Sequence, residues 1–143
     1  MKIHAFRLLP GQDLKQEIQA FAHRNNIRAG WIATCVGSLT QVHLRFADQP
    51  DGSLFTGHFE IVSLVGTVSI HGCHLHLCIS DERGRSTGGH LLEGNSVYTT
   101  AEVVMGETGG LEFLREADAE TGWKELRVAG TTKRTEGTKA ADY

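Results

Sequence analysis

The chain has 143 residues, and its 14 Lys and Arg against 17 Asp and Glu leave a formal net charge of −3 at pH 7. This length is typical of one domain around a single hydrophobic core, and 40% hydrophobic with 22% charged residues is ordinary for a globular protein. The slightly acidic balance argues against a protein that coats nucleic acid by charge alone, because phosphate neutralisation requires clustered Lys and Arg. Histidine stands out, with eight residues in the chain.

The N-terminal part of the chain predicts a strand, a helix and a second strand. Residues 2–9 form the expected first strand, and apolar residues at helical spacing then predict one amphipathic helix. Residues 30–36 are a mostly apolar run, which predicts a strand that is buried on both faces and is ended by Gly37-Ser38. The apolar stripe of the helix consists of Leu14, Ile18, Phe21 and Ala22.

Beyond Ser38 the apolar period changes from 3.6 to 2, which predicts a series of strands. Apolar and polar residues alternate over residues 42–46, as expected for a half-exposed strand. Residues 129–143 lack apolar periodicity, so we expect a disordered C-terminal tail after a domain that spans residues 1–128. The remaining predicted strands are residues 57–70, 73–80, 87–93 and 97–105, with weaker candidates at residues 111–113 and 123–128.

The cysteines and the N-terminus indicate the compartment. Cys35, Cys73 and Cys78 form neither an even-numbered disulfide framework nor a CxxC pair. Arg7 interrupts the N-terminal segment where a secretory signal would be continuously apolar, and no apolar run approaches the roughly 20 residues of a membrane-spanning helix. We therefore expect reduced thiols, no membrane partner and a cytoplasmic location.

A cluster of histidines on two predicted strands indicates a metal site. Polar and apolar residues alternate along residues 73–80, so His74 and His76 project from one face about 6.5–7 Å apart at Cα. A polar turn at residues 81–85 makes the next strand a hairpin partner, and this strand carries His90 as the expected third ligand. Three imidazoles suit Zn²⁺ or another divalent metal and leave a fourth position for water or another ligand.

Other groups near this motif have alternative interpretations. Cys78 shares the histidine face, but we expect a packed side chain rather than a fourth ligand. Glu60 and Glu102 are the best carboxylates for a second-shell or general-base role, and the alternative for each is a solvent-facing strand residue. The HxH motif also approximates the first metal motif of cupins, but no histidine follows His90 to supply a second one. Phosphate-binding loops and nucleophile elbows are absent, so we assign no catalytic residue.

In their order along the chain, these motifs resemble the plants-and-prokaryotes conserved (PPC) domain in its single-domain prokaryotic form. Residues 57–66, GHFEIVSLVG, are similar to the G-R-F-E-I-L-S-L-x-G segment of the family, with His58 in the place of Arg. The H-x-H pair of residues 74–76, followed by Gly88-Gly89-His90-Leu91, resembles the H-x-H … G-G-H-L signature of prokaryotic members.

The resemblance implies a fold, an assembly and two contacts. The fold is a single α+β domain with a mixed, largely antiparallel sheet and one main helix, and the assembly is a homotrimer. The three histidines that map onto His74, His76 and His90 are associated with a bound metal in prokaryotic members, commonly zinc. Plant members use the G-R-F-E-I-L segment for contact with partner proteins, and it corresponds here to Gly57, His58, Phe59, Glu60, Ile61 and Val62.

Three hypotheses about function follow. The family implies a transcription-associated regulator that binds DNA, although Arg83-Gly84-Arg85, which echoes an AT-hook core, lies in an acidic context that predicts a hairpin turn. The second hypothesis is a zinc-dependent enzyme, in which the metal would activate water and Glu60 or Glu102 would act as base. The third is a scaffold or small-ligand-binding protein that uses the three-histidine site.

Overall fold

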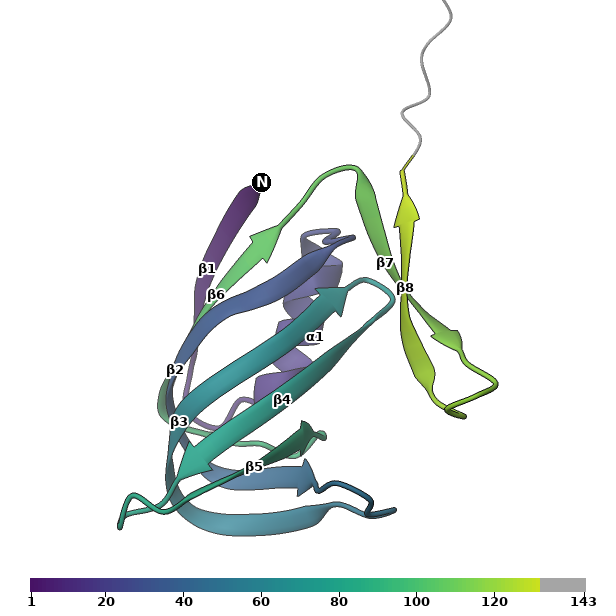
Figure 1. The fold of residues 1–143 in the computed structure, drawn as a ribbon. Helices are drawn as coiled ribbons and strands as arrows, with labels where there is room; N and C mark the ends of the chain where they lie inside the picture. The colour runs from purple at the N-terminus through teal and green to yellow at the C-terminus, as the bar shows by residue number, and fades with distance from the viewer. Residues whose placement is uncertain (132–143) are drawn as a thin grey trace, which may run out of the picture.

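The structure is a computed structural model that describes residues 1–131. The described chain folds into one helix and eight strands, and its helix is not long and apolar enough to cross a membrane. Figure 1 shows a curved sheet with the helix behind it and a separate two-stranded hairpin at one end. The elements are β1 (Lys2–Leu8), α1 (Leu14–Arg24), β2 (Gly30–Arg45), β3 (Ser53–Ser69), β4 (Gly72–Ser80), β5 (Ser86–Leu91), β6 (Val97–Glu107), β7 (Leu111–Ala117) and β8 (Lys124–Gly130).

Six strands form one antiparallel sheet in the order β1-β6-β2-β3-β4-β5. The far end of β2 also pairs with β5, where Leu44 lies opposite Leu91 and Arg45 opposite His90. This second pairing curls β2 to β5 into a partly closed barrel (Figure 1). The single-domain α+β fold expected from the family resemblance is confirmed, and every pairing between the described strands is antiparallel.

The helix begins at a polar clamp. The Asp13 carboxylate caps α1 by accepting a hydrogen bond from the backbone N–H of Gln16 at 2.9 Å. Its second oxygen accepts hydrogen bonds from the backbone N–H groups of Gly94 and Asn95, both at 2.7 Å. One side chain therefore joins the start of the helix to the connection between β5 and β6.

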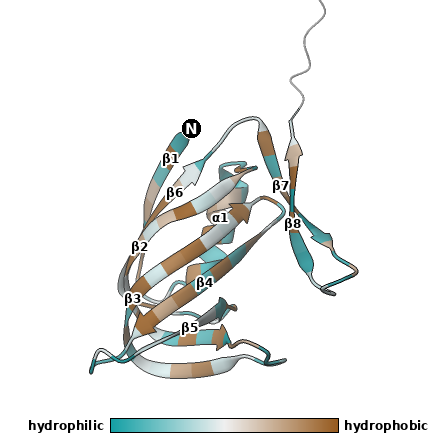
Figure 2. Ribbon diagram, in the orientation of Figure 1, coloured by the Kyte–Doolittle hydropathy of each residue, from teal (hydrophilic) through white to brown (hydrophobic). Residues whose placement is uncertain are grey.

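Apolar side chains from the helix and the inner face of the sheet form one core. Figure 2 shows hydrophobic residues along the middle of β2, β3 and β4. The alternation predicted for β4 is confirmed, because Leu75, Leu77 and Ile79 are at most 1% exposed while the alternate residues on the other face are not buried. Those residues are His74, His76 and Cys78. The helix contributes its predicted stripe, of which Leu14, Ile18 and Ala22 are fully buried and Phe21 is partly buried.

Two predictions about β2 are wrong. Gly37-Ser38 does not end the strand, which runs from Gly30 to Arg45, 16 residues in all, with a register shift in its pairing to β6 between Gly37 and Leu39. Glycine permits a bulge here because Gly37 packs directly against the backbone of Thr100. The strand is also not buried on both faces, since Ala33 and Thr34 are exposed and Val36 is 56% exposed. Because several exposed side chains of β2 are also apolar, the sequence does not show the alternation of apolar and polar residues expected for a strand with one exposed face.

The C-terminal hairpin of β7 and β8 extends well beyond the two short strands predicted there. It pairs from Leu111 opposite Gly130 to Ala117 opposite Lys124, and Figure 1 shows it beside the sheet rather than in it. Strand β8 therefore includes residues 129 and 130, which were expected to open the tail. Residues 132–143 of that expected tail lie outside the described residues.

Candidate metal centre

Two neighbouring strands bring the three predicted histidines together. His74 and His76 project from β4 two residues apart, and His90 of β5 lies directly opposite His76 in the antiparallel register. The close backbone approach depends on Gly88 and Gly89, because a Cβ at either position would stand within 3 Å of a backbone carbonyl oxygen. One nitrogen from each imidazole lies within 4.8 Å of the others.

The donor set fits a divalent metal that prefers nitrogen ligands. The Nε2 atoms of His74 and His76 are 3.2 Å apart. Two nitrogens on a tetrahedral zinc ion lie about 3.3 Å apart when each Zn–N bond is about 2.0–2.1 Å. Three imidazoles would fill three positions of such an ion, and one position would accept water or another donor. These residues therefore fit the group that the family resemblance implied.

The surroundings keep two of the imidazoles in the form that binds metal. Partial burial, with further contributions from His74 and Arg45, lowers the pKa of His90 to about 4. Burial also lowers the pKa of His74, and the charge of Arg115 acts in the same direction. At neutral pH both rings are therefore uncharged, so metal binding there does not have to displace a proton from either.

The hairpin of β7 and β8 adds residues that the sequence analysis did not identify. A cavity of about 490 Å³ contains His74 and His90 on one side and Arg115 and Glu125 on the other. Arg115 and Glu125 also line a smaller cavity of about 260 Å³ that includes His76. No motif marks these two residues, because they become neighbours of the histidines only when the hairpin folds back onto β4.

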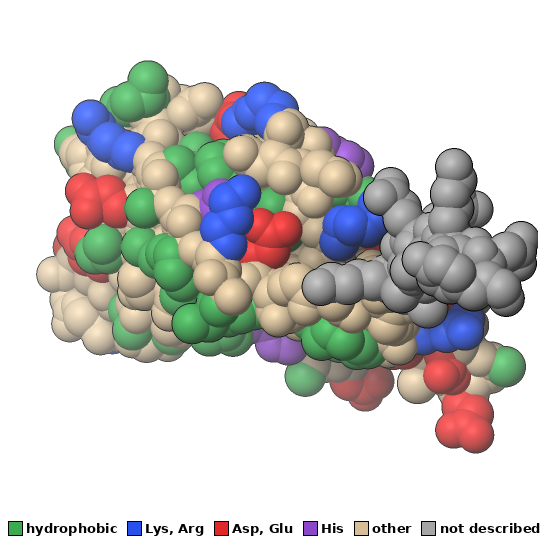
Figure 3. Space-filling view, turned by 90° about the horizontal axis from the view of Figure 1, so that it is seen from above, with side chains coloured by type: hydrophobic (Ala, Val, Ile, Leu, Met, Phe, Trp, Pro, Cys, Tyr) green, Lys and Arg blue, Asp and Glu red, His purple; other side chains and the backbone are tan. Residues whose placement is uncertain are grey.

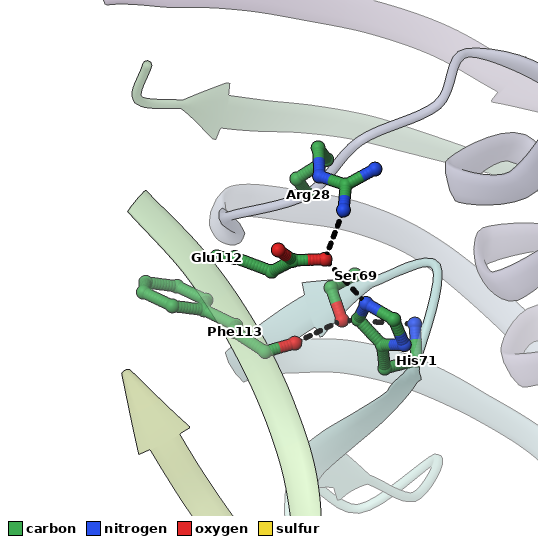
Figure 4. A network of polar contacts seen from close by, with 5 residues as sticks. All are labelled: Arg28, Ser69, His71, Glu112 and Phe113. Atoms are coloured by element: carbon green, nitrogen blue, oxygen red, sulfur yellow. Dashed lines mark hydrogen bonds and ion pairs between the residues drawn. The ribbon is translucent and has the colours of Figure 1, made fainter. Parts of the chain in front are cut away.

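A polar network fixes the hairpin in this place (Figure 4). The Glu112 carboxylate of β7 pairs with Arg28 and accepts a hydrogen bond from His71 Nε2 at 2.7 Å. The hydrogen bond from His71, aided by the Arg28 charge, lowers the pKa of Glu112. Ser69 donates from its hydroxyl to the Phe113 carbonyl at 2.7 Å, so the turn between β3 and β4 holds the strand that carries Arg115.

The structure does not bring Glu60 or Glu102 to the histidines. Both are exposed, and neither lines a cavity that contains His74, His76 or His90. Their register explains this, since Glu60 lies opposite Ser38 and Glu102 opposite Val36. The sequence pattern placed both carboxylates in strands, but it did not predict which residues of the neighbouring strands each would lie opposite.

The cysteines also lie outside the group of three imidazoles. Cys78 is half-buried on β4 and is not among the groups whose donor atoms converge. Burial raises the pKa of the Cys35 thiol to about 12 and also raises that of Cys73. All three cysteines are free, and the two with a raised pKa hold neutral thiols that are poor nucleophiles and poor ligands at neutral pH.

The predicted partner-contact segment occupies the first half of β3, away from the metal centre. The His58 and Tyr98 rings are in contact, with centroids 4.4 Å apart and planes tilted by 34°. Phe59 is half-buried and Ile61 is 6% exposed, whereas Val62 is 55% exposed. The segment therefore presents His58, Glu60 and Val62 to solvent, together with Gly57, while its other two side chains face the core.

The polar turn predicted at residues 81–85 is confirmed. Ser80 pairs with Ser86, and the Asp81 carboxylate accepts hydrogen bonds from the backbone N–H groups of Arg83 and Arg85 at 2.9 and 3.0 Å. The Arg85 side chain pairs with the same carboxylate at 2.7 Å. The sequence Arg-Gly-Arg is therefore a hairpin turn, with Gly84 at a φ of +74° that favours glycine.

Fold and site together define a small α+β domain in which one antiparallel sheet carries three convergent imidazoles. The model of the Plants and Prokaryotes Conserved (PCC) domain matches residues 1–109, and the chain belongs to this family. It is the same family as the PPC domain that the sequence motifs resemble. The bifunctional protein GlmU of Synechococcus sp. strain JA-3-3Ab is 42% identical over 135 residues, which cover 94% of this chain and 22% of that protein. The chain thus spans about a fifth of the length of the curated relatives that it matches.

Solved structures show the same fold. A hypothetical protein from Salmonella enterica is 45% identical, with a TM-score of 0.89 over 92% of this chain and 95% of that one. A protein from Archaeoglobus fulgidus, described as metal-containing, is 27% identical, with a TM-score of 0.76 over 89% and 94%. A candidate DNA-binding protein from Bacteroides thetaiotaomicron, at 21% identity and a TM-score of 0.79 over 87% and 91%, shares the fold.

Proposed function

We propose that this chain is a metal-binding protein that holds a divalent ion, zinc by preference, between His74, His76 and His90. The observation that carries the proposal is the 3.2 Å separation of the His74 and His76 Nε2 atoms, which matches one edge of a tetrahedral zinc site. The lowered pKa values of His74 and His90 support it, because neutral rings are the ligating form. The metal-containing relative from Archaeoglobus fulgidus supports it further.

In this proposal the metal centre is part of a ligand-binding module. It does not take part in catalysis with Glu60 or Glu102, the carboxylates that the sequence analysis considered. Glu60 and Glu102 do not line the cavities around the histidines, which leaves the zinc-enzyme hypothesis without its expected base. A segment similar to this chain makes up about a fifth of a longer relative, which supports a module that works beside other domains. The free thiols suit a reducing compartment, and we assign the protein to the cytoplasm.

The test is the metal content of the purified protein by elemental analysis. We expect about one zinc per chain in the wild type, and less than about a tenth of that in His76→Ala and His90→Ala, because each removes one of three ligands. His23→Ala removes an exposed histidine at the end of α1 and is the matched control, which should keep its metal. Full metal content in both ligand variants would refute the assignment.

The same proposal includes a homotrimer. Val36, Val62 and Val65 are each more than half exposed on the sheet, and an apolar surface of this kind favours association with another copy. The hairpin adds further exposed apolar side chains, Leu126 and Val128. Light scattering during gel filtration should return the mass of three 15.6-kDa chains, and a monomer mass at all concentrations would contradict this.

DNA association with a regulatory role is the second candidate function, because two structural neighbours are described as candidate DNA-binding proteins. On the face in Figure 3, Lys and Arg side chains stand apart, several beside Asp or Glu. Pairing with Asp81 and Glu116 also engages Arg85 and Arg127. A basic surface would therefore have to form across copies. Mobility shift of duplex DNA should then fall steeply between about 50 and 200 mM salt, and no shift at 50 mM would exclude this function.

A further inference from the structure

The larger cavity beside the histidines has an excess of positive charge, although the chain as a whole is acidic. Three cationic side chains line it, Arg45, Arg115 and Lys124, against one carboxylate, Glu125. A cavity with this charge attracts an anion.

Arg115 is the cation with an unused donor. Its Nη2 donates to the Lys124 carbonyl across the hairpin at 2.5 Å. Its Nη1 is buried and has no hydrogen-bond partner among the described residues. An unpaired buried N–H of a guanidinium is costly, so a small rotation that gives Nη1 an acceptor in the adjoining cavity is favourable. An oxyanion would accept two N–H bonds from the same guanidinium.

The position of Arg115 is set by its surroundings. The network of Glu112, His71 and Arg28 anchors β7 three residues before Arg115. The stem of Arg115 packs beside the start of β4, where its Cγ would be 3.4 Å from an ideal Cβ at Gly72, an ordinary van der Waals distance. The guanidinium is therefore held over the histidine side of the hairpin by contacts made elsewhere.

The cavity also offers an aromatic wall. The guanidinium of Arg45 lies 4.7 Å from the centre of the Trp123 ring, so the two side chains form a cation–π pair that links β2 to the hairpin. Trp123 is 59% exposed, which leaves ring surface free for a second contact. A volume of about 490 Å³ is large enough for a small organic molecule.

From these observations we propose that the cavity between the β7–β8 hairpin and the histidines binds a small organic anion. The anion's carboxylate or phosphate is held by Arg115, with Arg45 and Lys124 contributing charge, and its apolar part packs against Trp123. This anion site rests on the proposed function in one respect, because it supplies the class of ligand for the proposed ligand-binding module. Two of the proposed metal ligands, His74 and His90, line the same cavity. The anion site itself is made by residues that are not metal ligands.

The test is titration of the isotopically labelled full-length protein, first free of metal and then loaded with zinc. Sodium benzoate and inorganic phosphate are the probes, at constant ionic strength with chloride as the reference anion. We expect saturable amide shifts in Gly72 and in residues 115–125, and an indole shift of Trp123 with benzoate only. Stronger binding of benzoate assigns the site to a carboxylate on an apolar body, and stronger binding of phosphate assigns it to a phosphate.

Variants separate this site from nonspecific attraction. Arg115→Gln should raise the dissociation constant about tenfold or more. Arg115→Lys should raise it less, because lysine keeps the charge but not the planar pair of donors. Arg127→Gln is the matched control, since Arg127 lies on the same hairpin but pairs with Glu116 outside the cavity. Its affinity should stay within about twofold of the wild type.

A second variant guards against misfolding. Arg45→Gln acts from β2 rather than from the hairpin, and it should also weaken both probes while the melting temperature is checked in parallel. Unchanged affinity in Arg115→Gln, or no saturable binding of either probe to metal-free protein, would overturn the anion site. Failure of the metal centre would appear instead as absent zinc with anion binding intact, so the two failures are distinguishable.

Discussion

The six-stranded sheet and the β7–β8 hairpin are held by different forces. The sheet surrounds a core in which Leu75, Leu77 and Leu91 are at most 1% exposed. On the hairpin every residue of β8 is exposed or half-buried, and the attachment depends on polar contacts around Glu112. The histidines belong to the first region, whereas Arg115 and Glu125 belong to the second.

The comparison shows how one cavity combines a rigid wall with a movable one. Burial of apolar surface stabilises a sheet cooperatively, while ion pairs at the surface contribute little each. Opening of the hairpin alone should therefore cost much less than unfolding of the sheet. The proposed metal ligands are held in place by the stable region, and the proposed anion contacts are brought to them by the less stable one.

The largest expected effect breaks the sheet. Leu75→Ala removes a fully buried side chain between His74 and His76 of β4, and it should lower the free energy of unfolding by about 2–5 kcal/mol. Urea denaturation measures this loss. Leu54→Ala, at a site 59% exposed on β3, is the control and should change stability by less than about 0.5 kcal/mol. Equal losses in the two variants would show that the core lies elsewhere.

A smaller effect is expected at the polar clamp of the helix. Asp13→Ala removes the cap of α1 and the acceptor for two backbone N–H groups, which should cost about 1–3 kcal/mol in the same denaturation experiment. Asp51→Ala changes an exposed loop aspartate and should leave stability within about 0.5 kcal/mol. An unchanged free energy of unfolding in Asp13→Ala would contradict the role of this clamp.

The hairpin should respond without the sheet. Glu112→Gln keeps the shape of the side chain but removes the charge that pairs with Arg28, so amides of β7 and β8 should exchange with solvent faster. Global stability should change little, because ion pairs at the surface contribute little to folding. Glu116→Gln, which only loses its exposed pair with Arg127, is the matched control for hydrogen exchange. Faster exchange throughout β3 and β4 would show that the regions are not separable.

Acid should have the smallest and most local effect. The pKa of Glu112 is lower in the folded chain than its ordinary value of 4.5. The stabilisation that the ionised Glu112 gives to the hairpin is therefore fully present above pH 4.5, and it is lost as the pH falls through the pKa of Glu112 in the folded chain. Amide protection of the hairpin, corrected for intrinsic exchange, should therefore fall in that acid range before the sheet unfolds. Glu112→Gln should remove this dependence, and its persistence there would assign the effect to another group.

Much of the site could be predicted because its pattern is local. His74 and His76 lie two residues apart on one strand, and a short polar turn places His90 across from them, so strand geometry alone predicts their convergence. The expected roles of Glu60 and Glu102 depended on which part of the sheet each strand would bring near β4. That depends on register shifts, such as the one between Gly37 and Leu39, which no local pattern marks.

By itself the sequence determined the family, the order of the helix and strands, and the three-histidine face of β4, because alternation and turn residues act over a few neighbours. Only the tertiary structure decided that β2 runs unbroken with an apolar outer face, and that Arg115 and Glu125 lie opposite the histidines. Those neighbours lie about 25 to 50 positions apart in the sequence, and the polar network of Arg28, His71 and Glu112 holds them together. Such long-range polar pairing leaves no periodic signal in the chain.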